Sequence, residues 1–181
     1  MNSSTFPDAL TPEYEFRDYM FASKAIDRLK QFHAEKDGRP FMLGIGFKSP
    51  HLCMHVPYKY FNMYRDHVPK WRAAAARNIL QYPRSSPSVG FSLSINNRFK
   101  FMNQEGRFKF NKSVLLPHTR DIAFPTEAYV EAMWGYSAAV SFADAQLGRV
   151  LDAIDAADMW QEVVIVVTSD HGMHNGEKGI W

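Results

Sequence analysis

Apolar positions recur at helical spacing in two stretches of the chain. From Ala22 to Phe32 they return every three or four residues, and Asp37-Gly38 then ends the pattern, which predicts a helix over residues 22–37. A longer stretch follows Pro125 and predicts a second helix with one face packed on a large core. The positions on that face are Met133, Tyr136, Val140, Ala143, Leu147, Val150 and Ile154. A short helix is expected over residues 58–64, after Pro57.

Two short apolar runs predict buried strands. Residues 41–47 read FMLGIGF, and residues 163–168 read VVIVVT. Runs of this length without polar alternation are typical of strands covered on both faces of a parallel sheet. The order of strand, helix and strand therefore predicts an α/β fold, with functional groups at the sheet edge where the strands end.

The middle of the chain has a different composition. Between Arg65 and Arg120 there are eleven Lys or Arg and two acidic residues, a formal excess of +9, whereas the whole chain carries only +2. We expect a long basic excursion over residues 65–124, with a hairpin around Asn96-Asn97. The excursion is either a solvated face or a surface that steers anionic substrates. The small total charge does not indicate a nucleic-acid partner.

The composition also bears on the cellular compartment. The longest apolar run, residues 163–167, is far shorter than the ~20 residues of a membrane-spanning helix, so no membrane span is expected. The first twenty residues carry four acidic residues and no continuous apolar segment, which argues against a signal peptide there. Cys53 is the single cysteine, which excludes an internal disulfide and leaves the compartment open.

Asp170 and His171 follow directly after the second predicted strand, and Gly172 allows a sharp turn behind them. A carboxylate suits Ca²⁺ or Mg²⁺, and imidazole suits Mn, Zn or Fe. The pair therefore indicates a divalent metal site, with Asp170 as the firmer ligand. The alternative is an ordinary turn stabilised by a hydrogen-bonded aspartate.

His51 follows the first predicted strand, at the end of Lys48-Ser49-Pro50-His51. Taken alone, it is typical of a histidine in a surface turn. His51, Cys53 and His55 together also allow a zinc site. We do not favour zinc, because Pro50 and Pro57 prevent the helix that would align the two histidines.

Three blocks of the chain resemble the sulfatase family, and its iduronate-2-sulfatase type in particular. The blocks occur along the chain in the same order as in the family. Residues 168–172, TSDHG, and 176–181, GEKGIW, are similar to the family segment in which S-D-H-G is followed by G-E-H-G and a Trp. Residues 136–151 resemble the preceding helix, and residues 40–57 the strand with its K-P-H turn. The resemblance covers about residues 22–64 and 125–181. It implies an alkaline phosphatase-type mixed sheet flanked by helices, of which residues 1–181 are a partial catalytic domain truncated at both ends.

The resemblance implies roles for four residues. Asp170 and His171 correspond to metal ligands, with Ca²⁺ as the expected ion. His51 corresponds to a catalytic residue that contacts the sulfate near the leaving oxygen. Lys178 stands where the family usually has His and is expected to bind the sulfate as well.

Other parts of the family site have no counterpart in the chain. The two acidic metal ligands and the C-x-P-S-R or C-x-A-x-R segment, which yields formylglycine, are expected in a missing N-terminal part. Cys53 cannot substitute, because Met54-His55-Val56-Pro57 follows it. We therefore expect a parent enzyme that hydrolyses a sulfated small molecule or glycan, in a lysosomal or secreted setting, and a chain that is inactive alone. The alternatives are a phosphoesterase or phosphonate monoester hydrolase of the same superfamily, or a non-catalytic anion-binding fragment.

Overall fold

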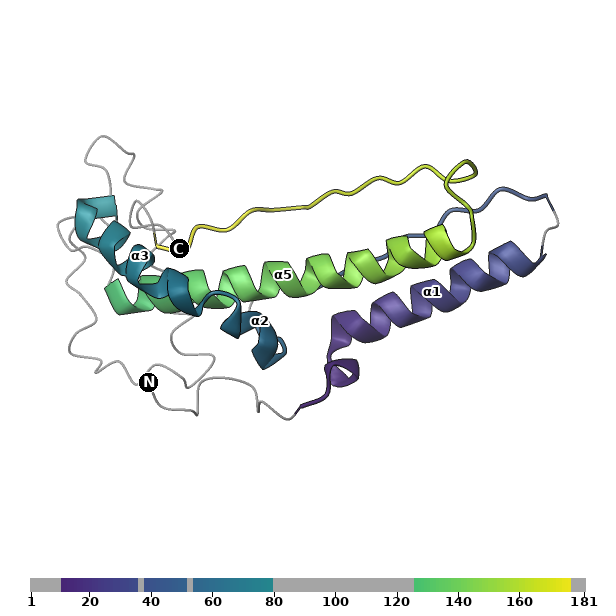
Figure 1. Ribbon diagram of the computed structural model, residues 1–181. Helices are drawn as coiled ribbons and strands as arrows, with labels where there is room; N and C mark the ends of the chain where they lie inside the picture. Colours follow the sequence, from purple (N-terminus) through teal and green to yellow (C-terminus); the bar gives the residue numbers. More distant parts are fainter. Residues whose placement is uncertain (1–10, 36–37, 52–53, 80–125, 177–181) are drawn as a thin grey trace, which may run out of the picture. The chain divides into compact units, whose positions relative to one another are not determined.

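A computed structural model describes residues 11–35, 38–51, 54–79 and 126–176. The regular elements in these ranges are helical (Figure 1): η2 (Glu13–Glu15), α1 (Arg17–Glu35), α2 (Tyr58–Asn62), η3 (Arg65–His67), α3 (Val68–Ala74), η4 (Ala75–Ile79) and α5 (Thr126–Ala156). The three helices predicted from the sequence are confirmed as α1, α2 and α5. Across the described ranges no helix is both long and apolar enough to cross a membrane.

Helix α1 begins at Arg17, earlier than the apolar pattern predicted. Its first turn contains Asp18, a favourable position for a carboxylate beside the positive end of the helix dipole. Gly38, beyond the other end, has a φ of +73°, which glycine adopts without strain. The polar first turn therefore lengthens the helix beyond its apolar stripe.

The chain divides into two compact units, and each is described by itself. The first unit comprises residues 6–62 and 137–169. Within it, α1 lies alongside the last turns of α5 (Figure 1) and shares a hydrophobic cluster with them. The buried members of the cluster are Ala22, Ala25, Leu29, Val150, Ile154 and Met159.

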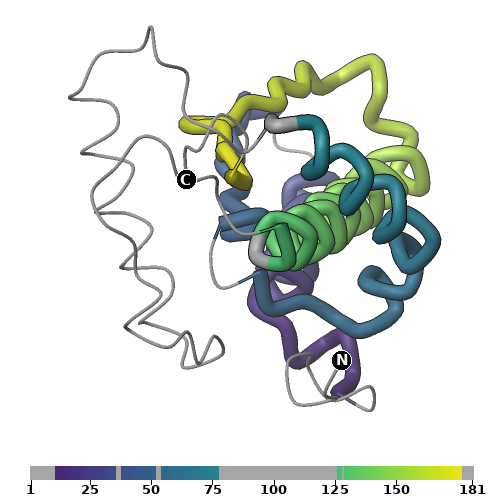
Figure 2. Tube along the Cα trace, turned by 90° about the vertical axis from the view of Figure 1, so that its left-hand side faces the viewer, coloured from purple at the N-terminus to yellow at the C-terminus, as the bar shows by residue number. Residues whose placement is uncertain are grey.

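Two extended segments of the first unit pack against this cluster. Leu43, Ile45 and Phe47 contact it from one segment, and Val163 from the other. Side chains next to them point away: Met42 is 96% exposed, and Val164 is 93% exposed. Both segments run opposite to α5 (Figure 1), and the end-on view separates them as two tubes (Figure 2).

The backbone is extended where strands were predicted, but no strand is assigned within the described ranges. A strand requires backbone hydrogen bonds to a neighbouring strand. The predicted sheet therefore stays a prediction.

The apolar stripe of α5 differs from the predicted one near the middle of the helix. Val140, expected in the core, is 41% exposed, whereas Phe142 is 1% exposed. The rings of Phe16 and Tyr60 lie 5.8 and 5.3 Å from that of Phe142, in edge-on arrangements. Aromatic packing has therefore selected Phe142 in place of Val140. Val150 and Ile154 are buried as predicted.

The second unit comprises residues 1–5, 63–136 and 170–181. Its described part contains η3, α3, η4 and the first turns of α5. Of these elements, η3, α3 and η4 were not predicted from the sequence. A proline in the first turn and the alanines that follow favour a helix in α3. Arg72 forms a two-pronged ion pair with Glu127, at 3.0 and 2.8 Å. The hairpin expected around Asn96-Asn97 lies outside the described residues.

Candidate functional site

His51 lies in a tight turn at the end of the first extended segment. The His51 amide donates a hydrogen bond to the Lys48 carbonyl at 2.9 Å, and the Met54 amide donates to the His51 carbonyl at 3.2 Å. The side chain of His51 is exposed. The turn therefore presents the imidazole at the surface of the first unit, at the position predicted from the sequence.

Asp18, in the first turn of α1, also stabilises this turn through side-chain hydrogen bonds. One carboxylate oxygen of Asp18 accepts a hydrogen bond from the Lys48 amide at 2.9 Å, and the other accepts one from the Ser49 amide at 2.8 Å. Asp18 is only 2% exposed. This contact was not predicted from the sequence, because Asp18 and the turn are about thirty residues apart and the helix was expected to begin only at residue 22.

Asp170 and His171 follow the second extended segment, and both are exposed. The His171 amide donates a hydrogen bond to Oδ1 of Asp170 at 2.9 Å, which holds this carboxylate oxygen beside the backbone. Asp170 and His171 belong to the second unit, whereas His51 belongs to the first. The structure therefore describes these two parts of the candidate site separately.

The donor chemistry of Asp170 and His171 fits part of a divalent metal site. A carboxylate and an imidazole are both metal ligands, and exposure leaves them accessible to an ion. Within the described ranges no three His, Cys, Asp or Glu side chains cluster as a metal site would require. The described residues thus offer two groups suited to a metal ion and no complete ligand set.

The remaining candidates can be located in part. Lys178 and Cys53 lie outside the described residues. The ring of His55 lies 5.1 Å from that of Phe16, so this imidazole packs against an aromatic side chain. The zinc interpretation therefore gains no support from the described part of the chain.

A polar network that was not predicted from the sequence joins the helices of the first unit. Gln146 is fully buried, and its amide nitrogen donates to Glu13 at 3.2 Å. Tyr60 donates to the same carboxylate at 2.6 Å, and Lys59 forms an ion pair with it. Burial raises the pKa of Glu13, but the hydrogen bonds and the Lys59 charge lower it more, so the net pKa is below its usual value. The network has no sequence signature, because its members are far apart along the chain.

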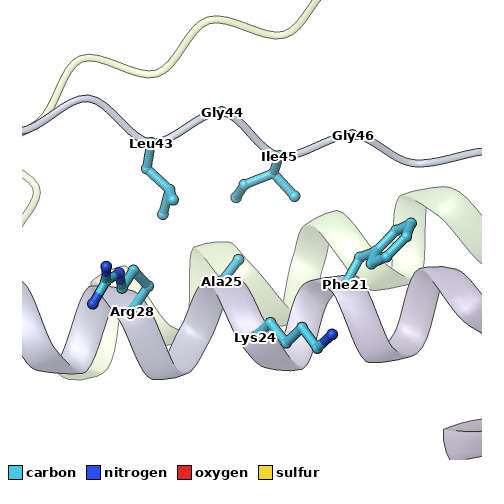
Figure 3. A pocket seen from close by; sticks show the side chains of 8 residues that line it. All are labelled: Phe21, Lys24, Ala25, Arg28, Leu43, Gly44, Ile45 and Gly46. Carbon is cyan, nitrogen blue, oxygen red and sulfur yellow. The ribbon is translucent and has the colours of Figure 1, made fainter.

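An open groove of about 380 Å³ lies between α1 and the first extended segment. Leu43 and Ile45 point into it from the segment and Ala25 from the helix, with Lys24 and Arg28 along the helix (Figure 3). The lining contains no acidic, cysteine or histidine side chain. The groove therefore does not resemble a catalytic pocket.

Comparison with known proteins identifies the family. The Sulfatase family profile matches residues 2–181. A sulfatase of Formosa agariphila is 31% identical over 175 residues, which are 95% of this chain and 28% of the relative. Human iduronate 2-sulfatase is 28% identical over 170 residues, covering 94% of this chain and 28% of the relative. A choline-sulfatase of Rhizobium meliloti is 21% identical over 169 residues, which are 93% of this chain and 28% of the relative.

No solved structure matches the chain. The chain spans 28% of the length of each of these curated relatives. The family implies an alkaline phosphatase-like α/β fold, in agreement with the predicted fold class. A profile match over almost every residue establishes that the chain belongs to the sulfatase family.

Proposed function

We propose that this chain is one part of a sulfatase that hydrolyses sulfate esters. The observation that carries the proposal is the Sulfatase profile match over residues 2–181. The exposed pair of Asp170 and His171, after an extended apolar segment, supports it from the structure. The three relatives described above are named as sulfatases, which favours sulfate over phosphate esters as the substrate class.

Asp170 and His171 are proposed as ligands of a divalent metal, with Ca²⁺ as the expected ion. A metal neutralises charge on the non-bridging oxygens of a sulfate ester. Asp170 supplies negative charge to the ion and His171 a neutral donor. Because the described residues offer only a partial ligand set, the remaining acidic ligands are proposed to lie outside the described residues, in the first part of the parent protein.

His51 and Lys178 are proposed to act on the sulfate group. An exposed imidazole on a braced turn can donate a hydrogen bond or a proton to the departing oxygen, which lowers the barrier to ester cleavage. Lys178 adds a positive charge that favours binding of the anionic ester. The nucleophile, a formylglycine in the proposed mechanism, is supplied by another part of the parent protein. The substrate is a sulfated small molecule or glycan.

The two extended segments are proposed as strands of a mixed sheet in the complete catalytic domain. They run in the same direction and pack one face on the same helices, as strands of a parallel α/β sheet do (Figure 1). Val164 is 93% exposed and Val166 is 79% exposed, so the outer face of the second segment is apolar and uncovered there. Further strands and helices of the parent protein would cover it.

An assay of the complete gene product with an aryl sulfate tests the proposal. Asp170→Ala is expected to abolish metal retention, measured by elemental analysis, and His171→Asn to weaken it less, because an amide oxygen can still act as a ligand. His51→Ala is expected to lower kcat by about 10²- to 10⁴-fold, the usual contribution of general acid catalysis, without loss of metal.

Asp152→Ala is the control, since Asp152 is an exposed carboxylate on α5 and outside the proposed site. It should leave both metal content and turnover unchanged. Stoichiometric metal in the Asp170 variant would refute the ligand assignment. Metal-dependent turnover by residues 1–181 alone, lost on His51→Ala, would refute the proposal that the nucleophile lies elsewhere.

A further inference from the structure

The carboxylate of Asp18 is buried at the start of α1, with 2% of the residue exposed. An ionised carboxylate is costly to remove from water unless hydrogen bonds replace its hydration. Both oxygens of Asp18 accept such bonds from the turn before His51, one from the Lys48 amide and one from the Ser49 amide. The burial of Asp18 is therefore linked to the conformation of a segment about thirty residues away.

These two bonds brace the turn at its beginning. Within the turn, the His51 amide bonds to the Lys48 carbonyl, and the Met54 amide bonds to the His51 carbonyl. The Lys48 and Ser49 amides stand at the end of an extended segment that pairs with no strand in the described ranges. Asp18 thus supplies acceptors that a neighbouring strand does not, and it attaches the end of the segment to α1.

We propose that Asp18 is a positioning residue that holds the turn in the conformation presenting His51 to a sulfate group. The inference rests on the proposed function for the role of His51. A catalytic side chain must be held within about 0.5 Å of its productive geometry, and misplacement by about 1 Å can cost 10²-fold in rate. The backbone of the turn places the Cα atom of His51 and so sets the region that its exposed imidazole can reach.

Amide hydrogen exchange in the full 181-residue chain tests the anchoring. Asp18→Ala removes both acceptors, whereas Asp18→Asn retains one carbonyl oxygen. We expect exchange at Lys48 and Ser49 to be about 10- to 100-fold faster in Asp18→Ala, as for the loss of hydrogen bonds to a charged group, and intermediate in Asp18→Asn. Asp27→Asn, an exposed aspartate on the same helix, is the matched control and should leave both rates unchanged.

A titration with inorganic sulfate, followed by the imidazole resonances of His51, tests the consequence for the site. We expect the apparent Kd for sulfate to rise about tenfold or more in Asp18→Ala, less in Asp18→Asn, and not at all in Asp27→Asn. Circular dichroism confirms that each variant keeps the helix content of the wild-type chain. If Asp18→Ala loses helix content, the exchange rates and the sulfate Kd of Asp18→Asn are compared with those of the wild-type chain instead.

The outcomes separate the inference from the proposed function. Unchanged exchange at Lys48 and Ser49 in a folded variant would overturn the anchoring. Faster exchange with an unchanged sulfate response would show that Asp18 braces the turn without positioning His51, which also overturns the inference. A wild-type chain whose His51 resonances ignore sulfate would refute the proposed role of His51, and the measured amide protection would then identify Asp18 as a structural anchor alone.

Discussion

Replacement of Arg149 by alanine tests whether this residue, which bonds to Gln146 of the polar network, stabilises the first unit. One guanidinium nitrogen, Nη1, donates to the Tyr19 carbonyl at 3.1 Å and to Gln146 at 2.9 Å. The other, Nη2, donates to the Ser23 hydroxyl at 2.8 Å. The guanidinium carbon also lies 3.6 Å from the centroid of the Tyr19 ring. Arg149 thus links α5 to α1 through two hydrogen bonds, to Tyr19 and Ser23, and a cation–π contact, whereas its bond to Gln146 lies within α5.

The expected loss follows from these contacts. A hydrogen bond to a charged group contributes about 1.5–3 kcal/mol, and a cation–π contact about 0.5–2 kcal/mol. The contributions do not add, because one half-buried side chain makes all of them. We expect Arg149→Ala to lower the free energy of unfolding by about 2–4 kcal/mol. Arg149→Lys should lower the free energy of unfolding by less, since the lysine ammonium keeps the positive charge but lacks the planar array of N–H donors of a guanidinium.

Urea unfolding of the full chain, followed by circular dichroism, measures this change. The free energy of unfolding is obtained from the urea midpoint, provided that its dependence on urea concentration is the same in both proteins. Arg28→Ala is the control: Arg28 is exposed and bonds at 2.7 Å to Gln31 within the same helix, a contact that contributes about 0.2–0.5 kcal/mol. If Arg149→Ala costs no more than Arg28→Ala, the view that Arg149 joins the two helices is wrong.

Two further predictions concern the same unit. Phe142→Ala should lower the free energy of unfolding by about 3–5 kcal/mol, because Phe142 is buried between Phe16 and Tyr60, and urea unfolding that shows a loss below about 1 kcal/mol would contradict this packing. The pKa of Glu13 is below its usual value of 4.5, so its stabilising contribution is present above that pH and is lost as the pH falls through the lowered pKa. Glu13→Gln should therefore flatten the acid side of the stability profile, and an unchanged profile in urea titrations at several pH values would refute the role of Glu13.

The helices could be predicted because their information is local. The apolar spacing before Gly38 and after Pro125 is enough to identify α1 and α5, since a helix needs only contacts within its own turns and one apolar face. Similarly, the consecutive residues DHG identify Asp170 and His171 as candidates, whereas His51 became a candidate only through the family resemblance of residues 40–57. His51 lies in a turn, as expected from Pro50, and Asp170 is exposed, while the roles of both residues stay predictions.

Strand pairing could not be settled in the same way. Residues 41–47 and 163–168 have the composition of buried strands, yet a strand is defined by hydrogen bonds to a neighbour that the described residues do not provide. The sequence pattern predicts two segments suited to a sheet. In the structure both segments are extended, and the side chains that point away from the helices, such as Met42 and Val164, are exposed.

The sequence by itself determined the helix positions, the apolar character of the two extended segments and the identity of the candidate site residues. Only the tertiary structure decided that Phe142 rather than Val140 is buried, that Gln146 lies in the interior, and that Asp18 braces the turn of His51. The physical reason is that burial and hydrogen bonding of these side chains depend on partners distant along the chain. Such pairings leave no periodic signal in the sequence and appear only when the packed helices bring the partners together.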